Sequence, residues 1–312
     1  GNYLSAIHVL NPEEEFIAGW NNKSHPSIRN PFPTNPNYHF GPYHRSEWVT
    51  GAIRGSKNLN LEANKNLIKE IAGAGTWAGN FHNGIGLTKH TLLPHLRKAL
   101  SKSHKDQPSL SSALNVLEQW DGRSAEDVVS DTSFQPGHVI YLDWVSRLVN
   151  ATFEDELGTV HNFKDVDNVS LAMLFRALHN SQLEMKNSRD YFDDINTPTT
   201  ELQDEVFRST FEQTITHLSD QFGHADATRW QVERNKIEFK HDIFGKIADM
   251  YDSNFGTYVQ IVELKPTGAV GYSRWPLGQS SNITRGTDNK PVLDPHYLDM
   301  MPLYKEFRYR EK

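Results

Sequence analysis

Residues 257–264 read Thr-Tyr-Val-Gln-Ile-Val-Glu-Leu. Polar and apolar side chains alternate in this segment and β-branched residues are frequent, which is typical of a β-strand. The next four residues, Lys265-Pro266-Thr267-Gly268, form a turn sequence, and residues 269–275 can return as the second strand of a hairpin. The C-terminal part of the chain is therefore predicted to contain a sheet.

Helical periodicity dominates upstream of this hairpin, from about residue 46 to residue 222. Apolar residues recur there every three or four positions, which predicts helices at 61–71, 92–100, 110–120, 139–149, 169–178 and 200–222. Asn60 is expected to cap the first helix, and Gly122 and Gly223 are expected to follow the third and the last. The apolar residues of the last helix are Leu202, Val206, Ile215, Leu218 and Phe222.

The first 45 residues differ in sequence pattern from both the C-terminal hairpin and the helical region. The segment Phe16-Ile17-Ala18-Gly19-Trp20 predicts a short strand, and the prolines between residues 23 and 43 predict a long ordered loop. Because strands are predicted at both ends of the chain, we expect them to join one sheet, with the helices as an insertion or flanking layer. The expected organisation is a strand and proline-rich loop in 1–45, a mainly helical portion in 46–250, and returning strands with a tail in 251–312. Residues 278–295 are polar and are expected to form a loop.

Composition excludes several classes of protein. The 312 residues suggest about two domains, and 16 Phe, 11 Tyr and 7 Trp are enough for a sizeable core, which excludes wholesale disorder. No apolar run is long enough to predict a membrane span. A net charge of −7 without a basic patch argues against nucleic acid as a partner. The absence of cysteine excludes disulfides, thiolate metal sites and a cysteine nucleophile within these residues.

Fifteen histidines and several acidic clusters raise the question of a metal site. No His-Glu-x-x-His motif and no EF-hand loop is present, so surface or structural roles are favoured over ligation. The groups considered are His217, His224 and His241; His39 and His44; Asp165 and Asp167; and Asp190, Asp193 and Asp194. Two glycine pairs, in residues 73–75 and 84–86, match no phosphate-binding fingerprint and are interpreted as turns.

Several short segments, each common by itself, occur in a characteristic order. They are His8-Val9-Leu10-Asn11-Pro12, Phe16 to Asn22, Leu117-Glu118-Gln119-Trp120-Asp121-Gly122, Trp230 followed by Ile237 to His241, Gly278-Gln279-Ser280, and Asp294 to Asp299. Together they resemble the motifs of the penicillin acylase family of N-terminal nucleophile hydrolases, which read HV-NP…YI-NANN, L--WDG, W…L-F-H and GQSG…SPHY-DQ. The resemblance covers about residues 8–300 and only the later part of the family's β chain.

This resemblance implies an α+β fold, part of an αββα sandwich with a large helical portion. It implies hydrolysis of a linear amide in an acylated small molecule by a serine at the free N-terminus of the β chain, whose α-amine accepts the hydroxyl proton. Position 1 is Gly, and the family places that serine a few hundred residues before the Asn-Asn turn, which here is at 21. We therefore expect the nucleophile, the rest of the β chain and the α chain to come from other parts of one precursor (zymogen), and this fragment alone to be inactive.

Two residues are carried over as catalytic candidates. Asn21 matches the family's oxyanion-hole asparagine, whose amide N–H stabilises the charge that acyl transfer places on the carbonyl oxygen. Arg45 matches an arginine that helps to order the site. The alternatives are a turn asparagine and a surface arginine, and Asn22 is expected to be structural.

The chain also departs from the family. Some members bind calcium through an aspartate in the loop after the Asn-Asn turn, but residues 31–43 contain no Asp or Glu, so no metal and no cofactor are expected. Met300 follows Asp299 where the family has Gln. The sequence does not identify the acyl group of the substrate. By the family resemblance, the protein would be periplasmic or secreted if the source is bacterial. The competing classes are a non-catalytic helical binding or scaffold domain with a degenerate site, and a metallohydrolase.

Overall fold

A computed structural model gives the structure of the chain. It describes residues 12–18, 43–56, 59–73, 85–101, 107–160, 162–163, 166, 168–182, 189–251 and 258–311. The chain divides into two compact units, residues 1–57 and residues 58–312. In the first unit, residues 12–15 form a turn, and helix α1 (Tyr43–Gly55) carries Arg54, which pairs with Glu14.

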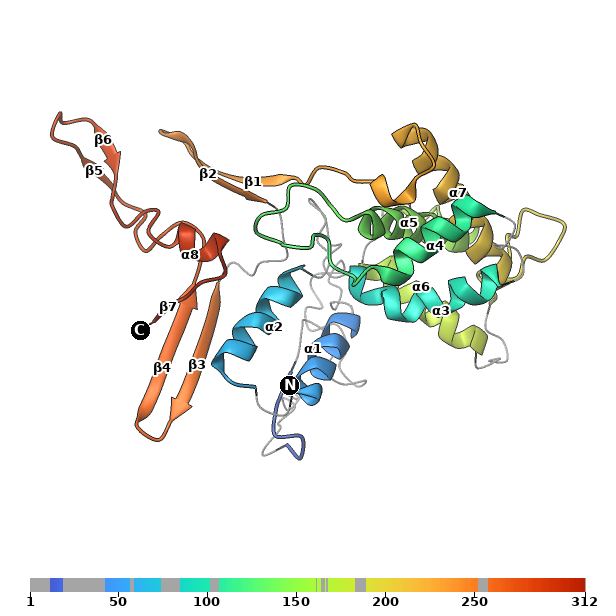
Figure 1. Cartoon of the computed structure of the whole chain (residues 1–312), viewed down its shortest axis with the longest axis horizontal. Coiled ribbons are helices and arrows are strands. Elements are labelled where there is room, and N and C mark those ends of the chain that lie inside the picture. The colour runs from blue at the N-terminus through green and yellow to red at the C-terminus, as the bar shows by residue number, and fades with distance from the viewer. Residues whose placement is uncertain are drawn as a thin grey trace, which may run out of the picture. The chain divides into compact units, whose positions relative to one another are not determined.

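The second unit begins with a run of helices, and those from residue 85 to residue 229 form a block (Figure 1). The helices of the run are α2 (Leu61–Gly73), the short 3-10 helix η1 (Ile85–Thr88), α3 (Lys89–Leu100), α4 (Pro108–Gln119), α5 (Pro136–Leu157), α6 (Asn168–Gln182), α7 (Gln203–Phe222) and the 3-10 helix η3 (Ala227–Arg229). Each predicted helix of 61–222 is present, which confirms the reading of the apolar periodicity. The α5 helix is longer than expected because Pro136 starts it and an apolar face continues to Phe153.

The main hydrophobic core lies among these helices. The α5 and α7 helices pack along each other (Figure 1), and Trp144 of α5 makes edge-to-face ring contacts with Phe207 and Phe211 of α7. All three side chains are fully buried. Aromatic pairs of this geometry stabilise a fold beyond the area that they bury, so the α5–α7 pair is the rigid centre of the block.

Local signals at the helix ends are largely confirmed. Asn60 Oδ1 accepts a hydrogen bond from Ala63 N at 2.9 Å, and Gly122 and Gly223 have φ values of +89° and +70°. Leu202 is different, because α7 starts at Gln203 and Leu202 is its 60% exposed N-cap residue. The helix starts late because the Leu202 backbone is extended and its N–H donates to the Glu205 side chain at 2.9 Å instead of joining the helical hydrogen bonds.

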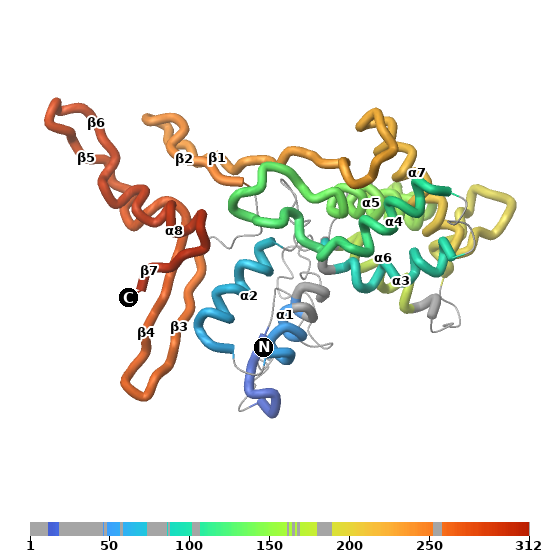
Figure 2. The backbone as a smooth tube through the Cα atoms, in the orientation of Figure 1, coloured from blue at the N-terminus to red at the C-terminus, as the bar shows by residue number. Residues whose placement is uncertain are grey.

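The strands follow the helices and form three small antiparallel sheets among the described residues. The β1 strand (Lys236–His241) pairs with β2 (Gly245–Tyr251), and β5 (Ile283–Arg285) pairs with β6 (Pro291–Leu293). The third sheet has the order β3-β4-β7, where β3 (Val259–Lys265) and β4 (Gly268–Arg274) form the predicted hairpin and β7 (Arg310–Glu311) lies beside β4 (Figure 2). A short helix, α8 (Met301–Lys305), precedes β7. The fold is α+β.

Three expectations about strands need correction. Residues 16–18 belong to no strand, and Gly19 and Trp20 lie outside the described residues, so the sheet expected to join the two ends of the chain is not seen in the described part. The segment 236–251, inside the portion expected to be mainly helical, forms the β1–β2 hairpin. The expected loop at 278–295 contains β5 and β6, whose three-residue length is too short to show alternation.

Candidate functional site

The two predicted catalytic residues fall where the structure gives no side-chain geometry. Asn21 and its neighbour Asn22 lie outside the described residues. Arg45 lies in the first turn of α1, and only its backbone is described. The motif segments from residue 117 onward lie in the second unit, and their side chains are described.

The Trp120-Asp121-Gly122 motif is a junction between α4, η1 and α5. Gly122 adopts a left-handed conformation, and a Cβ atom on it would lie 2.9 Å from the carbonyl oxygen of Gly86. A Cβ atom on Gly137, in the first turn of α5, would lie closer still to the Trp120 side chain. Three backbone segments therefore meet at distances that only glycine allows.

Polar contacts hold this junction together. The Trp120 indole N–H donates to the carbonyl of Arg123 at 2.6 Å, and Asp121 accepts from the Arg123 backbone N–H at 2.9 Å. Lys89 Nζ donates to the carbonyls of Glu118 and Trp120 at the end of α4, where the helix dipole favours a cation. Burial lowers the pKa of Lys89. These contacts fix the end of α4 against residue 123 and the start of α3, so the motif has a structural role.

The segment that starts at Trp230 is anchored by a buried arginine. Trp230 is fully buried, stacks on Phe222 and donates its indole N–H to the carbonyl of His224 at 3.0 Å. Arg234, only 2% exposed, donates to the carbonyls of Asp131 at 2.7 Å and Val128 at 3.0 Å. The chain between α7 and β1 is thereby tied to the loop that precedes α5.

The last two motif segments, about 20 residues apart in sequence, meet in the structure. Asp299 accepts hydrogen bonds from the Gln279 backbone N–H at 3.2 Å, from Arg310 Nη1 at 3.2 Å and, depending on its tautomer, from His296 Nδ1 at 3.1 Å. Burial alone would raise the pKa of Asp299, but these hydrogen bonds lower it below its usual value. Gly278 packs against the backbone of His296, where a side chain would collide. The two motifs are thus one structural unit centred on Asp299.

A second buried arginine fixes the C-terminal strand. Arg274 is fully buried, donates to the carbonyl of Tyr304 at 3.0 Å and lies 4.1 Å from the ring centroid of Phe307 and 5.3 Å from that of Tyr309. Burial lowers the pKa of Arg274 and raises that of Tyr304 to about 12. Cation–π contacts of this kind join β4 to the segment that leads into β7.

The β1–β2 hairpin rests on the same C-terminal region. The His241 ring meets Tyr297 edge-on at 6.0 Å, and Phe239 packs against a small core cluster of Met250, Met301 and Tyr304. Residues 237–241, 278–280 and 294–299 are therefore connected through these contacts, and together they are called the framework.

The groups considered for metal binding serve other purposes where they are described. His217 pairs with Asp143 at 2.9 Å, while Asp193 and Asp194 accept backbone N–H groups of Glu201 and Asn196 at 3.1 and 2.9 Å. Asp190 likewise accepts from Phe192 N. Asp165, Asp167 and His39 lie outside the described residues, as does the side chain of His44. Across the described ranges, no three His, Asp or Glu side chains are grouped so that they could hold a metal ion.

Sequence reasoning missed the residues that hold this framework. Arg234 and Arg274 do not stand out, because the sequence shows no signal for the burial of a charged residue. Asp299 lies in a motif, but the motif does not reveal its hydrogen-bond partners. The close approach of Gly86, Gly122 and Gly137 could not be read from spacing either.

No helix in the described part of the chain combines the length and apolar character needed to cross a membrane.

The class of protein follows from these observations together with one comparison. The described part is an α+β chain in which the Trp-Asp-Gly and Gly-Gln-Ser segments make the contacts described above. The family model for penicillin amidase matches residues 2–312. The chain therefore belongs to the penicillin amidase family, which is a family of amidohydrolases of the N-terminal nucleophile type.

Proposed function

We propose that this chain is the C-terminal part of the β chain of an enzyme that hydrolyses a linear amide of an acylated small molecule. The observation that carries the proposal is the family match over residues 2–312, which includes the Asn21-Asn22 segment as well as the framework motifs. In the proposed reaction, a serine at the free N-terminus of the complete β chain attacks the amide carbonyl. Its α-amine takes the hydroxyl proton and passes it to the amide nitrogen as the C–N bond breaks and the amine product leaves. Water, deprotonated by the same α-amine, then attacks the acyl-enzyme, and the proton returns to the serine oxygen as the acid is released.

Asn21 acts as an oxyanion donor in this proposal. The attack of the serine places negative charge on the carbonyl oxygen, and an amide N–H directed at that oxygen stabilises the transition state more than the substrate. Asn suits this role because its side-chain amide is a neutral donor that does not titrate. Arg45 orders the same site.

The nucleophile comes from outside residues 1–312, with the rest of the β chain and the α chain of the same precursor as partners. The reaction as proposed uses protein groups for nucleophile, base and oxyanion donor, so it needs no cofactor. We expect the 312-residue chain alone not to cleave a chromogenic phenylacetyl or aliphatic anilide. Turnover well above a buffer blank, after serine-directed inactivation of contaminants, would contradict this assignment of the nucleophile.

The decisive experiment tests Asn21 in the complete enzyme. Asn21→Ala is expected to leave KM nearly unchanged and to lower kcat by roughly 10²–10³-fold, the usual loss for one oxyanion donor. Asn22→Ala is the matched control, because it changes the adjacent residue of the same Asn-Asn pair and is expected to keep kcat. Melting temperatures of both variants separate catalysis from stability.

A kcat for Asn21→Ala within about threefold of the parent, with normal folding, would remove Asn21 from the mechanism, because a turn residue affects mainly stability. If the complete enzyme itself is inactive on all amides tried, the alternative of a non-catalytic helical binding or scaffold domain is favoured.

A further inference from the structure

The helical block contains a cavity that the proposed reaction does not use. It has a volume of about 280 Å³ and lies between α5, α7 and the segment where residue 134 meets residue 232, joined by the hydrogen bond from Phe134 N to Val232 O at 2.8 Å. None of its lining residues belongs to the segments assigned to catalysis. The α5 and α7 helices, which form two of its walls, are held together by the buried contacts of Trp144 with Phe207 and Phe211.

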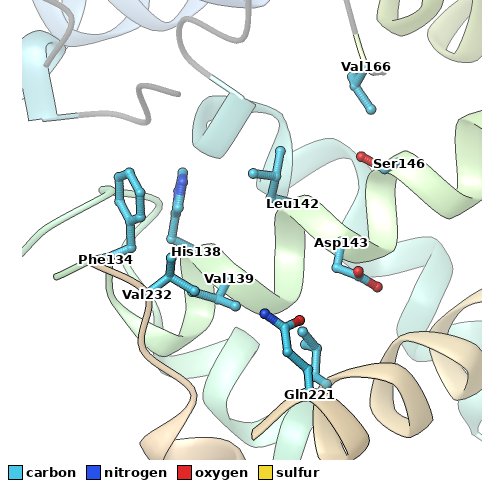
Figure 3. Close-up of a pocket in the computed structure, with 10 residues that line it drawn as sticks. Phe134, His138, Val139, Leu142, Asp143, Ser146, Val166, Gln221 and Val232 are labelled. Atoms are coloured by element: carbon cyan, nitrogen blue, oxygen red, sulfur yellow. The ribbon is translucent and has the colours of Figure 1, made fainter. Parts of the chain in front are cut away.

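The cavity has two chemically different ends (Figure 3). Phe134 and His138 lie at one end, with their rings stacked at a centroid distance of 4.8 Å. Asp143 and Ser146 lie at the other end, and Leu142 stands between the two ends on the same face of α5. An occupant would therefore meet ring and aliphatic surface, including the His138 imidazole, at one end, and the carboxylate of Asp143 and the hydroxyl of Ser146 at the other.

The charges at the polar end are balanced. Asp143 is bound by Arg147 Nε at 2.6 Å and by His217 Nδ1 at 2.9 Å, so its carboxylate already faces a permanent cation. A cationic ligand would compete with Arg147, and an anionic ligand would be repelled by Asp143. The hydrogen-bonding groups that remain for a ligand are neutral ones, namely the hydroxyl of Ser146 and the amide of Gln221, which both line the cavity.

We propose that this cavity is a binding site for a small neutral molecule that carries one ring and one hydroxyl or amide head group. The ring lies against Phe134, His138 and Leu142, and the head group exchanges hydrogen bonds with Ser146 and Gln221. The volume equals that of about nine liquid water molecules, which suits a single ring with a short substituent. The site is independent of the amide hydrolysis, since it needs neither Asn21 nor Arg45.

The test uses benzyl alcohol, which is neutral and has no amide bond to cleave. Its binding to the 312-residue chain is titrated by NMR, with the methyl signals of Val139 and Leu218 as reporters at the cavity wall. We expect saturable binding with a Kd on the order of 1 mM, as the affinity limits of a molecule with about eight non-hydrogen atoms allow. Benzylamine and benzoate, which have the same ring with a charged group, are expected to bind at least about tenfold more weakly.

Three variants locate the site. Ser146→Phe fills the cavity and should abolish saturable binding, while Ser112→Phe, at a half-buried serine on α4 outside the cavity, should leave the Kd unchanged. Gln221→Ala, at an exposed residue that should not disturb folding, should weaken binding about fivefold through the loss of one hydrogen bond. The proposal is overturned by no saturation at about ten times the expected Kd, by equal binding of the three probes, or by equal Kd values in Ser146→Phe and Ser112→Phe.

Discussion

Gly137→Ala provides a sharp test of the Trp-Asp-Gly junction, because two effects of opposite sign compete there. Gly137 lies in the first turn of α5, and replacing a helical glycine by alanine ordinarily stabilises by about 1 kcal/mol. Here the new Cβ would meet Trp120, whose Cδ1 is 3.0 Å away and whose Cβ and Cγ are closer still. Ordinary carbon contacts begin near 3.5 Å, so Trp120 or α5 must move by about 1 Å to relieve the closest of these contacts.

Trp120 cannot move freely, because it is 4% exposed, its indole N–H is bound to the Arg123 carbonyl, and its ring lies 5.4 Å from that of Tyr141. Overpacking of this kind costs about 1–3 kcal/mol and occasionally more. The steric term therefore outweighs helix propensity, and we expect a net destabilisation of about 2 kcal/mol, or a fall in melting temperature of roughly 4–8 °C.

Urea unfolding followed by tryptophan fluorescence measures this effect. Gly271→Ala is the control, because Gly271 lies inside β4 with no atom within 4 Å of a built Cβ and should gain about 0.5–1 kcal/mol. A Gly137→Ala variant as stable as the wild type would refute the close packing described for the junction.

Three further predictions concern other parts of the second unit. Tyr141→Phe removes the buried hydrogen bond to Thr88 Oγ1 (2.8 Å) and should lower the free energy of unfolding by about 1 kcal/mol, measured by urea unfolding; an unchanged midpoint would contradict it. Because the pKa of Asp299 is lowered in the folded state, its ionised form stabilises the fold above the unfolded pKa of about 3.9, and that contribution is lost as pH falls through the folded pKa. The stability difference between wild type and Asp299→Asn should therefore shrink on acidification from pH 7 to below about 3; a constant difference in parallel melting curves would count against it. Leu264, 83% exposed on the edge strand β3, should promote self-association of the isolated chain, so Leu264→Lys should shift light scattering toward monomer, whereas equal association of both proteins would exclude this edge.

The helices of residues 61–222 were predictable because their signals are local. A helix repeats every 3.6 residues, so the apolar residues that face the core reveal it without knowledge of its neighbours. Asn60 and Gly223 mark a beginning and an end through hydrogen bonds and backbone conformations within a few residues. The hairpin of 259–274 was predictable for the same reason, since its turn joins adjacent strands. The three-residue strands β5 and β6 were missed because they contain too few residues to show a period.

The candidate catalytic residues had a different origin. Nothing local distinguishes Asn21 from any asparagine in a turn, and Arg45 resembles any arginine near a helix start. Their roles were inferred from the order of motifs along the whole chain, and the family match over residues 2–312 supports the assignment of the family. The roles themselves stay predictions, because they depend on groups that local patterns do not specify.

The amino-acid sequence alone was enough to establish the α+β class, the positions of the long helices and the family. These properties depend on local periodicity and on motif order, and both can be recognised from the order of residues without knowledge of the tertiary contacts. The tertiary structure was needed to find the meeting of Gly137 with Trp120, the burial of Arg274 and the three partners of Asp299. Apart from the pair of His296 and Asp299, these contacts join residues at least 11 positions apart in the chain. Which residues meet therefore depends on which surfaces are brought together when the core packs.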